Sequence, residues 1–517
     1  MKGIPARIVP LLLLAVLWFG TLGLRPLYKA DETRYAEIPR EMVASGDWVT
    51  PRLNGFKYFE KPPLQYWATA AFYKTLGMAD WTSRLWAALL GFAGILLVLK
   101  VGNRLFGPPA GMLAAAVLAG SPVYVAAAQI NTLDMGLAFF LSGAVFALAL
   151  GYPIVFWACC AFAVLSKGLV GIVLPLAALG LYILLKRDWK MLWEVRPVSG
   201  PIVFLLIAAP WFVAVSLANP EFAHFFFIQE HFQRFTTEVH QRTAPFWFFL
   251  PVLALGFAPL LLPVAIGWWR GVRSSAPPFD AVFLLALWAL VVLAFFSASS
   301  SKLPAYILPM FPALALLAGR YLAEADRKFL LAQGAIVAAL GIAAAVILPG
   351  KGGAAYAAYV PWLAAAGVVT AVLGLASLFT KKYAAIALAA AGFIATQLAI
   401  IGHGTISERF TAAALIASIE PKPPARVPVY AVDIYDHSLP WYLRRTVTMV
   451  AYRDEFGAAI EWDRSLFVPT LDAFERGWAN HPEAYAFVGV GEFDKLAARL
   501  PMQVIARDAR YVFVRKP

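Results

Sequence analysis

The chain has 517 residues, of which 61% are hydrophobic and 14% are charged. Soluble globular proteins are roughly 45–50% apolar, so this composition excludes an ordinary soluble protein. Several segments of about 17–25 apolar residues are each long enough to cross a hydrocarbon layer of about 30 Å. The sequence therefore predicts a polytopic α-helical membrane protein.

The formal net charge of +13 does not indicate a nucleic-acid-binding protein. The Lys and Arg residues are scattered between apolar runs, without the clustered stripe that contacts a phosphate backbone. In such short loops basic residues report membrane topology instead. The two cysteines, Cys159 and Cys160, are adjacent inside an apolar run, so a disulfide between them is not expected.

The first apolar run follows Lys2 and Arg7 and has no small-residue cleavage site after it. This predicts a retained first helix and not a cleaved signal peptide. About thirteen spans are predicted in total. They lie near residues 8–24, 81–103, 109–128, 133–151, 153–166, 169–186, 201–218, 246–269, 281–298, 304–321, 330–348, 361–379 and 384–402.

An odd number of spans places the two ends of the chain on opposite sides of the membrane. With the N-terminus in the cytoplasm, the short loops rich in Lys and Arg fall on the cytoplasmic side, as the positive-inside rule requires. The longer polar segments, near residues 31–63 and 219–245, then fall on the other side. We expect the functional groups on that other side.

The composition changes after residue 403, and the chain is predicted to divide there. Residues 1–403 form a transmembrane domain whose first loop on the non-cytoplasmic side covers about 26–80; a Pro-rich linker covers 404–424 and a small α/β domain 425–517. Strands are predicted for VPVYAV, TVTMV, SLFVP, AYAFVGV and YVFV, and helices for DAFERGWAN and GEFDKLAARL.

A charged stretch, DETRYAEIPREMVASGDWVTPRLNGFKYFEKPP, separates the first two predicted spans. It opens with Asp31 and Glu32, which suit the first turn of a helix that starts after Ala30. Arg34 and further charges continue along one face, and an apolar stripe at helical spacing follows the other. This pattern predicts an interfacial helix with its charged face toward a cavity.

The same stretch ends with Glu60 and Lys61, directly before Pro62 and Pro63. Proline fixes its own φ and restricts the residue before it. The spacing therefore predicts a preorganised carboxylate and cation. The alternative is an ordinary surface ion pair.

Two charged residues interrupt apolar runs further along the chain. Asp134 lies near the mouth of a predicted span, and Lys167 lies between two apolar runs. An ionisable group at such a depth is costly and indicates a functional site. For Lys167 the alternative is a lysine whose ammonium reaches up to the membrane surface.

Two more segments on the same side carry polar residues. Lys302 and Tyr306 are suited to grip a phosphate, although an interface belt with a tyrosine anchor is the alternative. The segment 219–245 offers histidines and carboxylates, which are good zinc ligands, but its spacing fits no compact metal motif and also suits a solvated amphipathic helix. Its residues of interest are His224, His231, Arg234, Glu238, His240 and Arg242.

Together these groups predict a polar site for an anionic, lipid-linked substrate. Cations stabilise the charge that develops on a phosphate leaving group. A carboxylate orients or deprotonates an acceptor.

Over essentially its whole length the chain resembles the GT-C membrane glycosyltransferases of the protein O-mannosyltransferase-like superfamily. It is most similar to the bacterial transferases that move 4-amino-4-deoxy-L-arabinose from undecaprenyl phosphate to lipid A. The motifs that carry the resemblance are DETRYAEIPREM, YFEKPPLQYW, NTLDM, LSKG, EHFQRFTTEVHQRTAPFW, SSKLPAYILP and VYAVDIYDHSLPWYLRR.

The resemblance implies a glycosyltransferase of the bacterial inner membrane, with juxtamembrane helices and a C-terminal domain in the periplasm. Its donor would be an undecaprenyl-phosphate-linked sugar, and its acceptor lipid A or another envelope lipid or glycan. Asp31 would be the principal catalytic carboxylate, with Asp134 as a secondary one. The other implied site residues are Lys61, Lys167, Arg234, Lys302 and Tyr306 for the donor phosphate, Glu32 and Arg34 beside Asp31, and Glu60 with His240 for a Zn²⁺ ion.

Several alternatives stay open at this point. Asp31 would be a general base for a hydroxyl acceptor but an orienting group for a phosphate acceptor, which is already anionic. Another sugar or acceptor, including a protein or polysaccharide, would use the same scaffold. A lipid-linked sugar transporter or flippase is less favoured, because the sequence has no internal repeat and its charges gather on one side. The density of those charges also disfavours a structural scaffold.

Overall fold

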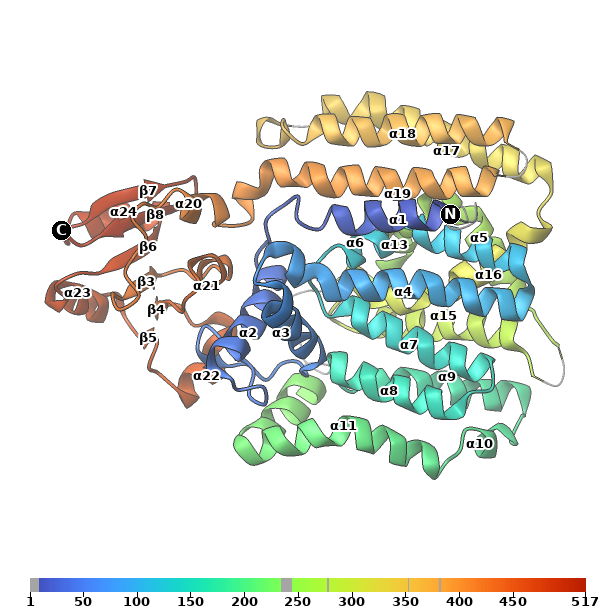
Figure 1. Cartoon of the computed structure of the whole chain (residues 1–517), viewed down its shortest axis with the longest axis horizontal. Helices are drawn as coiled ribbons and strands as arrows, with labels where there is room; N and C mark the ends of the chain where they lie inside the picture. The colour runs from blue at the N-terminus through green and yellow to red at the C-terminus, as the bar shows by residue number, and fades with distance from the viewer. Residues whose placement is uncertain (1–8, 234–243, 277–278, 352, 381–382) are drawn as a thin grey trace, which may run out of the picture. The chain divides into compact units, whose positions relative to one another are not determined.

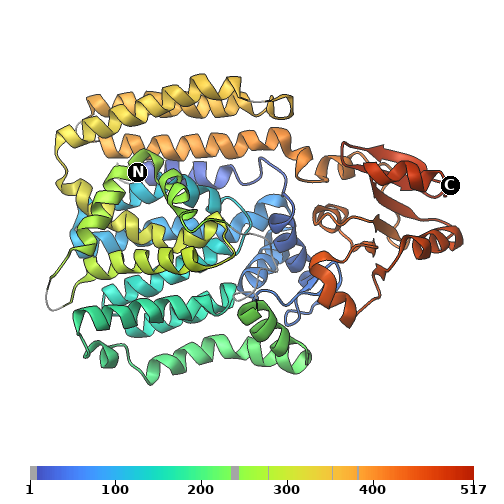
Figure 2. The same cartoon turned by 180° about the vertical axis from the view of Figure 1, so that it is seen from behind.

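The computed structural model describes residues 9–233, 244–276, 279–351, 353–380 and 383–517. The chain folds into two units, each assembled from separate stretches of sequence (Figures 1 and 2). The membrane unit comprises Met1–Leu22, Glu60–Gln65 and Arg84–Thr405. The α/β unit comprises Gly23–Phe59, Tyr66–Ser83 and Ile406–Pro517.

Apolar helices build the membrane unit. Among the described residues, seven helices are long and apolar enough to cross a membrane, two further pairs qualify as bent spans, and four apolar helices are shorter. Each predicted span coincides with one of these helices or pairs. The helices are α1 (Val9–Gly20), α4 (Asp80–Phe106), α5 (Pro108–Ala119), α6 (Pro122–Ala128), α7 (Asp134–Ala149), α8 (Pro153–Lys167), α9 (Val170–Lys186), α10 (Met191–Glu194), α11 (Ser199–Ala218), η1 (His224–Gln233), α13 (Phe249–Gly256), η2 (Ala258–Leu260), α14 (Leu261–Val272), α15 (Ala281–Ala298), η3 (Pro304–Met310), α16 (Phe311–Glu324), α17 (Arg327–Ile347), η4 (Leu348–Gly350), η5 (Ala354–Tyr356), α18 (Val360–Phe379) and α19 (Ala384–His403).

The two bent spans meet at their breaks. The chain turns by 67° between α5 and α6 and by 77° between α13 and the helical segment Ala258–Val272. Ser121 Oγ, in the first break, donates a hydrogen bond of 2.5 Å to the carbonyl of Gly256, at the second. The Gln333 side-chain amide donates another, of 2.9 Å, to the carbonyl of Pro259. Backbone groups freed by a broken helix need such partners because lipid supplies none.

Small residues allow α17 and α18 to approach closely. These two helices pack along their length, and α18 packs on α19 (Figures 1 and 2). A Cβ atom at Gly341 would lie 2.3 Å from the backbone nitrogen of Ala371, and one at Gly374 would lie 2.5 Å from that of Ala338. Such contacts between small residues hold helices together in lipid, where the hydrophobic effect gives no preference for a protein neighbour.

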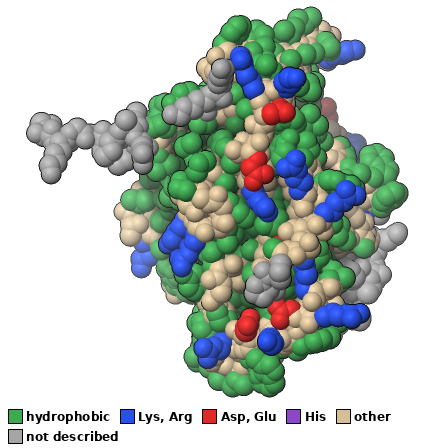
Figure 3. Space-filling model, turned by 90° about the vertical axis from the view of Figure 1, so that its right-hand side faces the viewer, with side chains coloured by type: hydrophobic (Ala, Val, Ile, Leu, Met, Phe, Trp, Pro, Cys, Tyr) green, Lys and Arg blue, Asp and Glu red, His purple; other side chains and the backbone are tan. Residues whose placement is uncertain are grey.

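Basic side chains spread over one end of the membrane unit. Figure 3 shows many Lys and Arg side chains and few Asp or Glu side chains on this face, which is the end where α10 lies in Figure 1. The sequence predicted that the short basic loops would share a side. The structure agrees with that grouping.

A mixed sheet forms the centre of the α/β unit. Its strand order is β5-β4-β3-β6-β8-β7, with β3, β4, β5 and β6 parallel and β8 antiparallel to both β6 and β7. All five predicted strands and both predicted helices are confirmed, and β7, an edge strand with a bulge, was missed. The elements are β3 (Val429–Val432), α21 (Ser438–Leu443), β4 (Thr448–Val450), η7 (Asp454–Phe456), α22 (Gly457–Trp462), β5 (Phe467–Val468), α23 (Leu471–Asn480), β6 (Tyr485–Gly489), α24 (Val490–Ala497), β7 (Gln503–Arg507) and β8 (Tyr511–Arg515), preceded by η6 (Gly404–Arg409) and α20 (Ala413–Ala417).

The first long loop belongs to the same unit as this sheet. It supplies α2 (Asp31–Ser45), a hairpin of β1 (Arg52–Leu53) and β2 (Phe56–Lys57), and most of α3 (Leu64–Leu76). Asn54, at the hairpin tip, exchanges two hydrogen bonds with the backbone of Val447, of 2.9 and 2.8 Å. Asp80 accepts hydrogen bonds from Trp441 and Tyr442. The predicted helix after Ala30 is confirmed as α2, but both its charged and its apolar faces are largely buried within the unit.

The close approach of α17 and α18 can be tested by one substitution. Gly341→Val should destabilise the folded protein by about 1–3 kcal/mol, because its side chain would meet backbone atoms that cannot move aside. The thermal unfolding midpoint in detergent should fall accordingly. Gly180→Val on α9 is the matched control, since no atom lies within 4 Å of a Cβ added there. Equal midpoints for the two variants would contradict the tight interface.

Candidate functional site

Asp134 and Lys167 form an ion pair between two packed helices. Asp134 is the first residue of α7 and Lys167 the last of α8, where the helix dipoles favour an anion and a cation respectively. The Lys167 ammonium donates a hydrogen bond to the Asp134 carboxylate, and the side chains are 18% and 15% exposed. Each residue therefore neutralises the other where little water is available.

Lys61 is held by carboxylates in a similar way. It lies just before α3, and its Nζ donates to Glu230 Oε1 at 2.6 Å and to the Glu60 carbonyl at 2.8 Å. The Glu60 carboxylate lies 3.9 Å away. Glu230 belongs to the π-helical segment η1, a conformation that occurs frequently at functional sites.

One cavity of the membrane unit brings the predicted residues Lys61, Lys167 and Tyr306 together. It has a volume of about 280 Å³, and Glu230, Ser299 and Ser301 complete its polar lining. The Lys167 Nζ lies 4.8 Å from the centre of the Tyr306 ring, within the range of a cation–π contact. Apolar side chains, among them Leu137, Val173 and Phe296, cover the remaining wall. The cavity thus offers two ammonium groups beside an apolar surface.

The remaining predicted site residues of the membrane unit do not line this cavity in the part of the chain that the structure describes. Lys302 lies beside the cavity, with its ammonium bonded to the carbonyl of Ser299. Arg234 and His240 lie outside the described residues. Among the residues that are described, no group of three or more His, Cys, Asp or Glu side chains could hold a metal ion. Glu60 supplies one carboxylate close to a competing ammonium, so the zinc pair stays a prediction.

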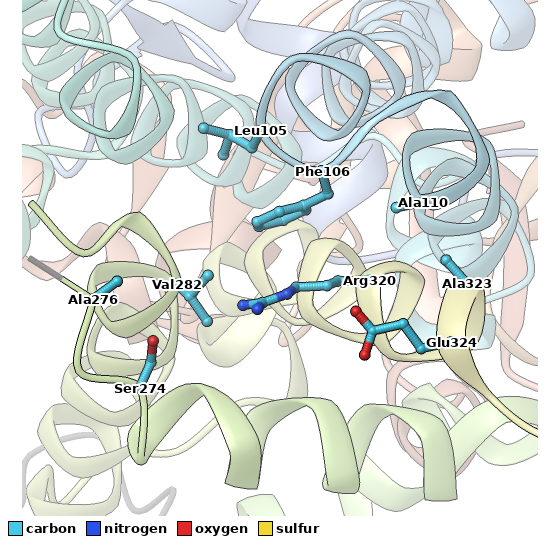
Figure 4. Close-up of a pocket in the computed structure, with 9 residues that line it drawn as sticks. All are labelled: Leu105, Phe106, Ala110, Ser274, Ala276, Val282, Arg320, Ala323 and Glu324. Carbon is cyan, nitrogen blue, oxygen red and sulfur yellow. The ribbon is translucent and has the colours of Figure 1, made fainter.

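A second cavity of the same unit has a different chemical character (Figure 4). Its volume is about 330 Å³, and it lies among the end of α4, the start of α5 and α16. Arg320 extends across it, with the guanidinium 5.5 Å from the Phe106 ring, and Glu324 lies next to it (Figure 4). This cavity offers one guanidinium beside a carboxylate, whereas the first offers two ammonium groups, each paired with a carboxylate.

In the α/β unit, α2 carries three carboxylate–arginine pairs. Arg25 binds Glu32 through both terminal nitrogens, at 2.5 and 3.1 Å, and Arg40 binds Glu37 at 2.5 and 2.7 Å. These two pairs are almost fully buried. The predicted site residue Glu32 therefore anchors the start of α2, and it also accepts a hydrogen bond from the backbone of Tyr28.

The third pair involves Asp31 and Arg34 and extends to the sheet. Arg34 Nη1 donates to Asp31 Oδ1 at 2.9 Å, and Nη2 donates to Glu455 Oε2 at 2.5 Å. The other oxygen of Glu455 is bonded to the imidazole of His437. The Asp31 side chain is 50% exposed, whereas that of Arg34 is 11% exposed. Asp31 thus presents a carboxylate that is fixed on one side and accessible on the other.

The neighbouring Asp436 holds the loop that carries His437. Its carboxylate accepts hydrogen bonds from Ser438, Tyr511 and Arg510, the last at 2.8 Å. Burial by itself raises the pKa of Asp436, but the hydrogen bonds from Ser438 and the charges of Lys29 and Arg510 outweigh it and hold the pKa below its usual value.

Three residues of these clusters were not singled out from the sequence. They are Glu230, His437 and Glu455. The spacing of charged residues around each of them does not indicate a functional site. His437 lies within the quoted motif VYAVDIYDHSLPWYLRR, which was the available signal. Glu230 is the first residue of the quoted motif EHFQRFTTEVHQRTAPFW, so the same kind of signal was available for it.

Comparisons with known proteins cover nearly the whole chain. Residues 415–516 match the family described as "Aminoarabinose transferase C-terminal domain", and residues 60–213 match "Dolichyl-phosphate-mannose-protein mannosyltransferase". The crystal structure of ArnT from Cupriavidus metallidurans bound to undecaprenyl phosphate superimposes with a TM-score of 0.94 at 35% identity, over 99% of this chain and 98% of that one. The apo structure of that ArnT gives a TM-score of 0.92.

Curated relatives align over part of their length. The undecaprenyl phosphate-alpha-4-amino-4-deoxy-L-arabinose arabinosyl transferase of Edwardsiella ictaluri is 34% identical over 57% of this chain and 56% of its own. One of the two such transferases of Sodalis glossinidius is 36% identical over 61% of this chain and 60% of its own. The aligned region therefore spans somewhat more than half of these relatives.

The fold and the comparisons define a multi-pass membrane protein with the GT-C fold and a C-terminal α/β region, as the sequence predicted. More narrowly, the chain belongs to the aminoarabinose transferase family.

The carboxyl group of Glu41 gives the α/β unit a measurable pH dependence. Burial, followed by the nearby Glu37 carboxylate, raises the pKa of Glu41 to about 8. In the unfolded chain the pKa of Glu is about 4.3, so between these values the folded state holds a proton that the unfolded state has lost. The free energy of unfolding should therefore decrease as the pH rises toward 8, by at most about 1.4 kcal/mol per pH unit. Above pH 8 this group should change it little.

We expect the thermal unfolding midpoint to fall between pH 6 and pH 8 because of this group. Glu41→Gln, which is neutral at every pH, should flatten that part of the profile. Glu461→Gln is the control, because Glu461 lies exposed on the same unit. An unchanged slope in Glu41→Gln would show that another group carries the proton.

Proposed function

We propose that the chain transfers 4-amino-4-deoxy-L-arabinose from undecaprenyl phosphate to lipid A. The observation that carries this proposal is the cavity in which Lys61 and Lys167 lie beside an apolar wall. Support comes from the similarity, over nearly the whole chain, to an ArnT structure with bound undecaprenyl phosphate. The names of the curated relatives suggest the sugar.

The cavity suits both ends of such a donor. The two ammonium groups and the hydroxyls of Ser299 and Ser301 can bind a phosphate. Leu169 and Val173 line the cavity and remain 37% and 46% exposed, so they can contact a polyprenyl chain. A lipid phosphate would replace Glu230 as the partner of Lys61, because both anions need the same ammonium.

The transfer breaks the bond between the anomeric carbon and the donor phosphate oxygen and forms a bond from that carbon to an acceptor oxygen. The donor phosphodiester has one negative charge, and the departing undecaprenyl phosphate gains a second as the bond breaks. Lysines near this oxygen therefore stabilise the transition state more than the bound donor, which is the condition for catalysis. In this proposal Lys61 and Lys167 have that role, and Asp134 holds Lys167 in place.

Asp31 is proposed as the catalytic carboxylate. Its ionised group can stabilise positive charge at the anomeric carbon or orient the acceptor, and a phosphate acceptor on lipid A needs no general base. The hydrogen bond from Arg34 fixes the direction of this carboxylate. A Zn²⁺ ion at Glu60 and His240 is a separate proposal on which none of these steps depends.

The membrane orientation is also a proposal. Because basic loops remain in the cytoplasm, the face shown in Figure 3 is placed on the cytoplasmic side of the inner membrane. The N-terminus is then cytoplasmic, and the C-terminal domain and the donor cavity are periplasmic.

Mass spectrometry of lipid A tests the proposed function. Cells that express the protein should show the mass increment of aminoarabinose, and cells that lack it or express Asp31→Asn should not. Asp472→Asn, an exposed residue of the same unit, should behave as wild type. If lipid A is unmodified in cells that express the protein, and an undecaprenyl-linked sugar accumulates in cells that lack it, the protein is a transferase with another acceptor. No change in either pool would overturn the transferase in favour of a transporter.

Lys61 and Glu230 should have opposite effects on the donor. Lys61→Ala removes a charged hydrogen bond worth about 1.5–3 kcal/mol, so kcat/KM for the donor should fall by about 10- to 100-fold. Glu230→Gln removes the competing anion and should lower the donor KM. Steady-state kinetics with purified protein measures both, with Glu324→Gln in the second cavity as control. A higher KM in Glu230→Gln would contradict competition for Lys61.

A further inference from the structure

Two residues of the C-terminal sheet lie at equivalent places in its topology. His437 follows β3, and Glu455 follows β4, the parallel neighbour of β3. The first residue after each strand, Asp433 after β3 and Ala451 after β4, has a positive φ of 55° and 58° respectively. Both loops thus turn sharply at the carboxyl edge of the sheet, the edge where open α/β sheets place their functional groups.

These two residues end a continuous chain of polar contacts that begins at Asp31. Asp31 accepts from one terminal nitrogen of Arg34, and Glu455 accepts from the other. His437 contacts both the Glu455 carboxylate and Arg34, the latter at 3.3 Å. Exposure is 19% for the Glu455 side chain and 10% for that of His437, so water screens these contacts weakly.

We propose that Glu455 and His437 are positioning residues for the transfer reaction, which act through Arg34 to set the direction of the Asp31 carboxylate. This inference rests on the role proposed for Asp31. The C-terminal domain would then supply residues to the catalytic machinery.

The physical reason lies in the shape of the guanidinium group. Arg34 has two terminal nitrogens, and a carboxylate can bind both at once in a bidentate pair. Glu455 occupies one of them, so Arg34 meets Asp31 with the other alone. If Glu455 were neutral, Arg34 could turn both nitrogens onto Asp31 and cover the oxygen that a substrate needs.

His437 keeps Glu455 in that position. Its ring packs against Tyr435, with centroids 5.0 Å apart, and Tyr435 packs against Phe456 at 4.8 Å. Asp436, fixed by Ser438 and Arg510, precedes it in the chain. The imidazole therefore meets Glu455 from a rigid support, as a positioning group requires.

The test is steady-state kinetics of the full-length protein with undecaprenyl-phosphate aminoarabinose and lipid A. Glu455→Gln should lower kcat by about 10- to 100-fold, the same range as the loss caused by removing an outer-shell partner of a metal ligand. The donor KM and the thermal unfolding midpoint should stay unchanged. His437→Ala should also lower kcat, and His437→Gln should restore part of it, because its amide can still donate to Glu455.

A double substitution separates action through Arg34 from a general structural effect. If Glu455 acts through Arg34, adding Glu455→Gln to Arg34→Ala should cause no further loss of kcat. The matched control is Glu461→Gln, since Glu461 pairs with Arg453 and Arg464 on the protein surface.

Three outcomes would overturn the inference. The first is a wild-type kcat in Glu455→Gln, and the second is a kcat in the double variant that is lower than in Arg34→Ala alone. The third is a lower unfolding midpoint in Glu455→Gln that accounts for its loss of kcat. If Asp31→Asn abolishes transfer while Glu455→Gln does not, only the positioning role fails. If Asp31→Asn retains full transfer, both the catalytic role proposed for Asp31 and the positioning role of Glu455 and His437 fail.

Discussion

Several charges in this protein are held against opposite charges where water is scarce. Lys167 with Asp134 and Lys61 with Glu230 follow this rule in the membrane unit, and Arg40 with Glu37 follows it in the α/β unit. Removing one partner from such a pair leaves a desolvated charge, which costs more than the pair gains. The candidate site is therefore neutralised before any substrate arrives. A phosphate that binds there has to exchange with a carboxylate, which favours a ligand with the correct charge and shape over any passing anion.

The architecture could largely be predicted because the membrane imposes it. Segments that must cross lipid reveal themselves by length and hydropathy alone, and every predicted span contains an apolar helix. The breaks at Ser121 and Phe257 could not be predicted in this way, because a bend depends on distant partners such as Gln333 for the freed carbonyl groups. The edge strand β7 was missed for a similar reason. Its residues are partly exposed and bulged, so the alternating pattern that marks a strand is weak.

The candidate site was predictable only in part. Lys61, Lys167 and Tyr306 were found from local motifs and the cost of charges near lipid, and the structure lines one cavity with all three. Asp134, the partner of Lys167, was also predicted. Glu230, the partner of Lys61, and Glu455, the partner of Arg34, were not predicted, because they lie 169 and 421 residues away in the sequence. Sequence spacing carries no information about such contacts. One local signal was overlooked: Asn54-Gly55 is a dipeptide typical of a tight hairpin turn, and the structure has that hairpin.

The hairpin at Asn54 also limits how this protein can be divided. Its side chain fills the hydrogen-bonding positions of Val447, and the nearby Trp441 is buried with Leu27, Ala36 and Tyr73 from the first loop. Residues 406–517 expressed alone would expose these surfaces to water. A chimera that exchanges only the C-terminal segment between two members of the family would join surfaces that evolved separately. An exchange of the α/β unit between two such proteins therefore requires the first loop and the C-terminal segment to be moved together, although they are far apart in the gene.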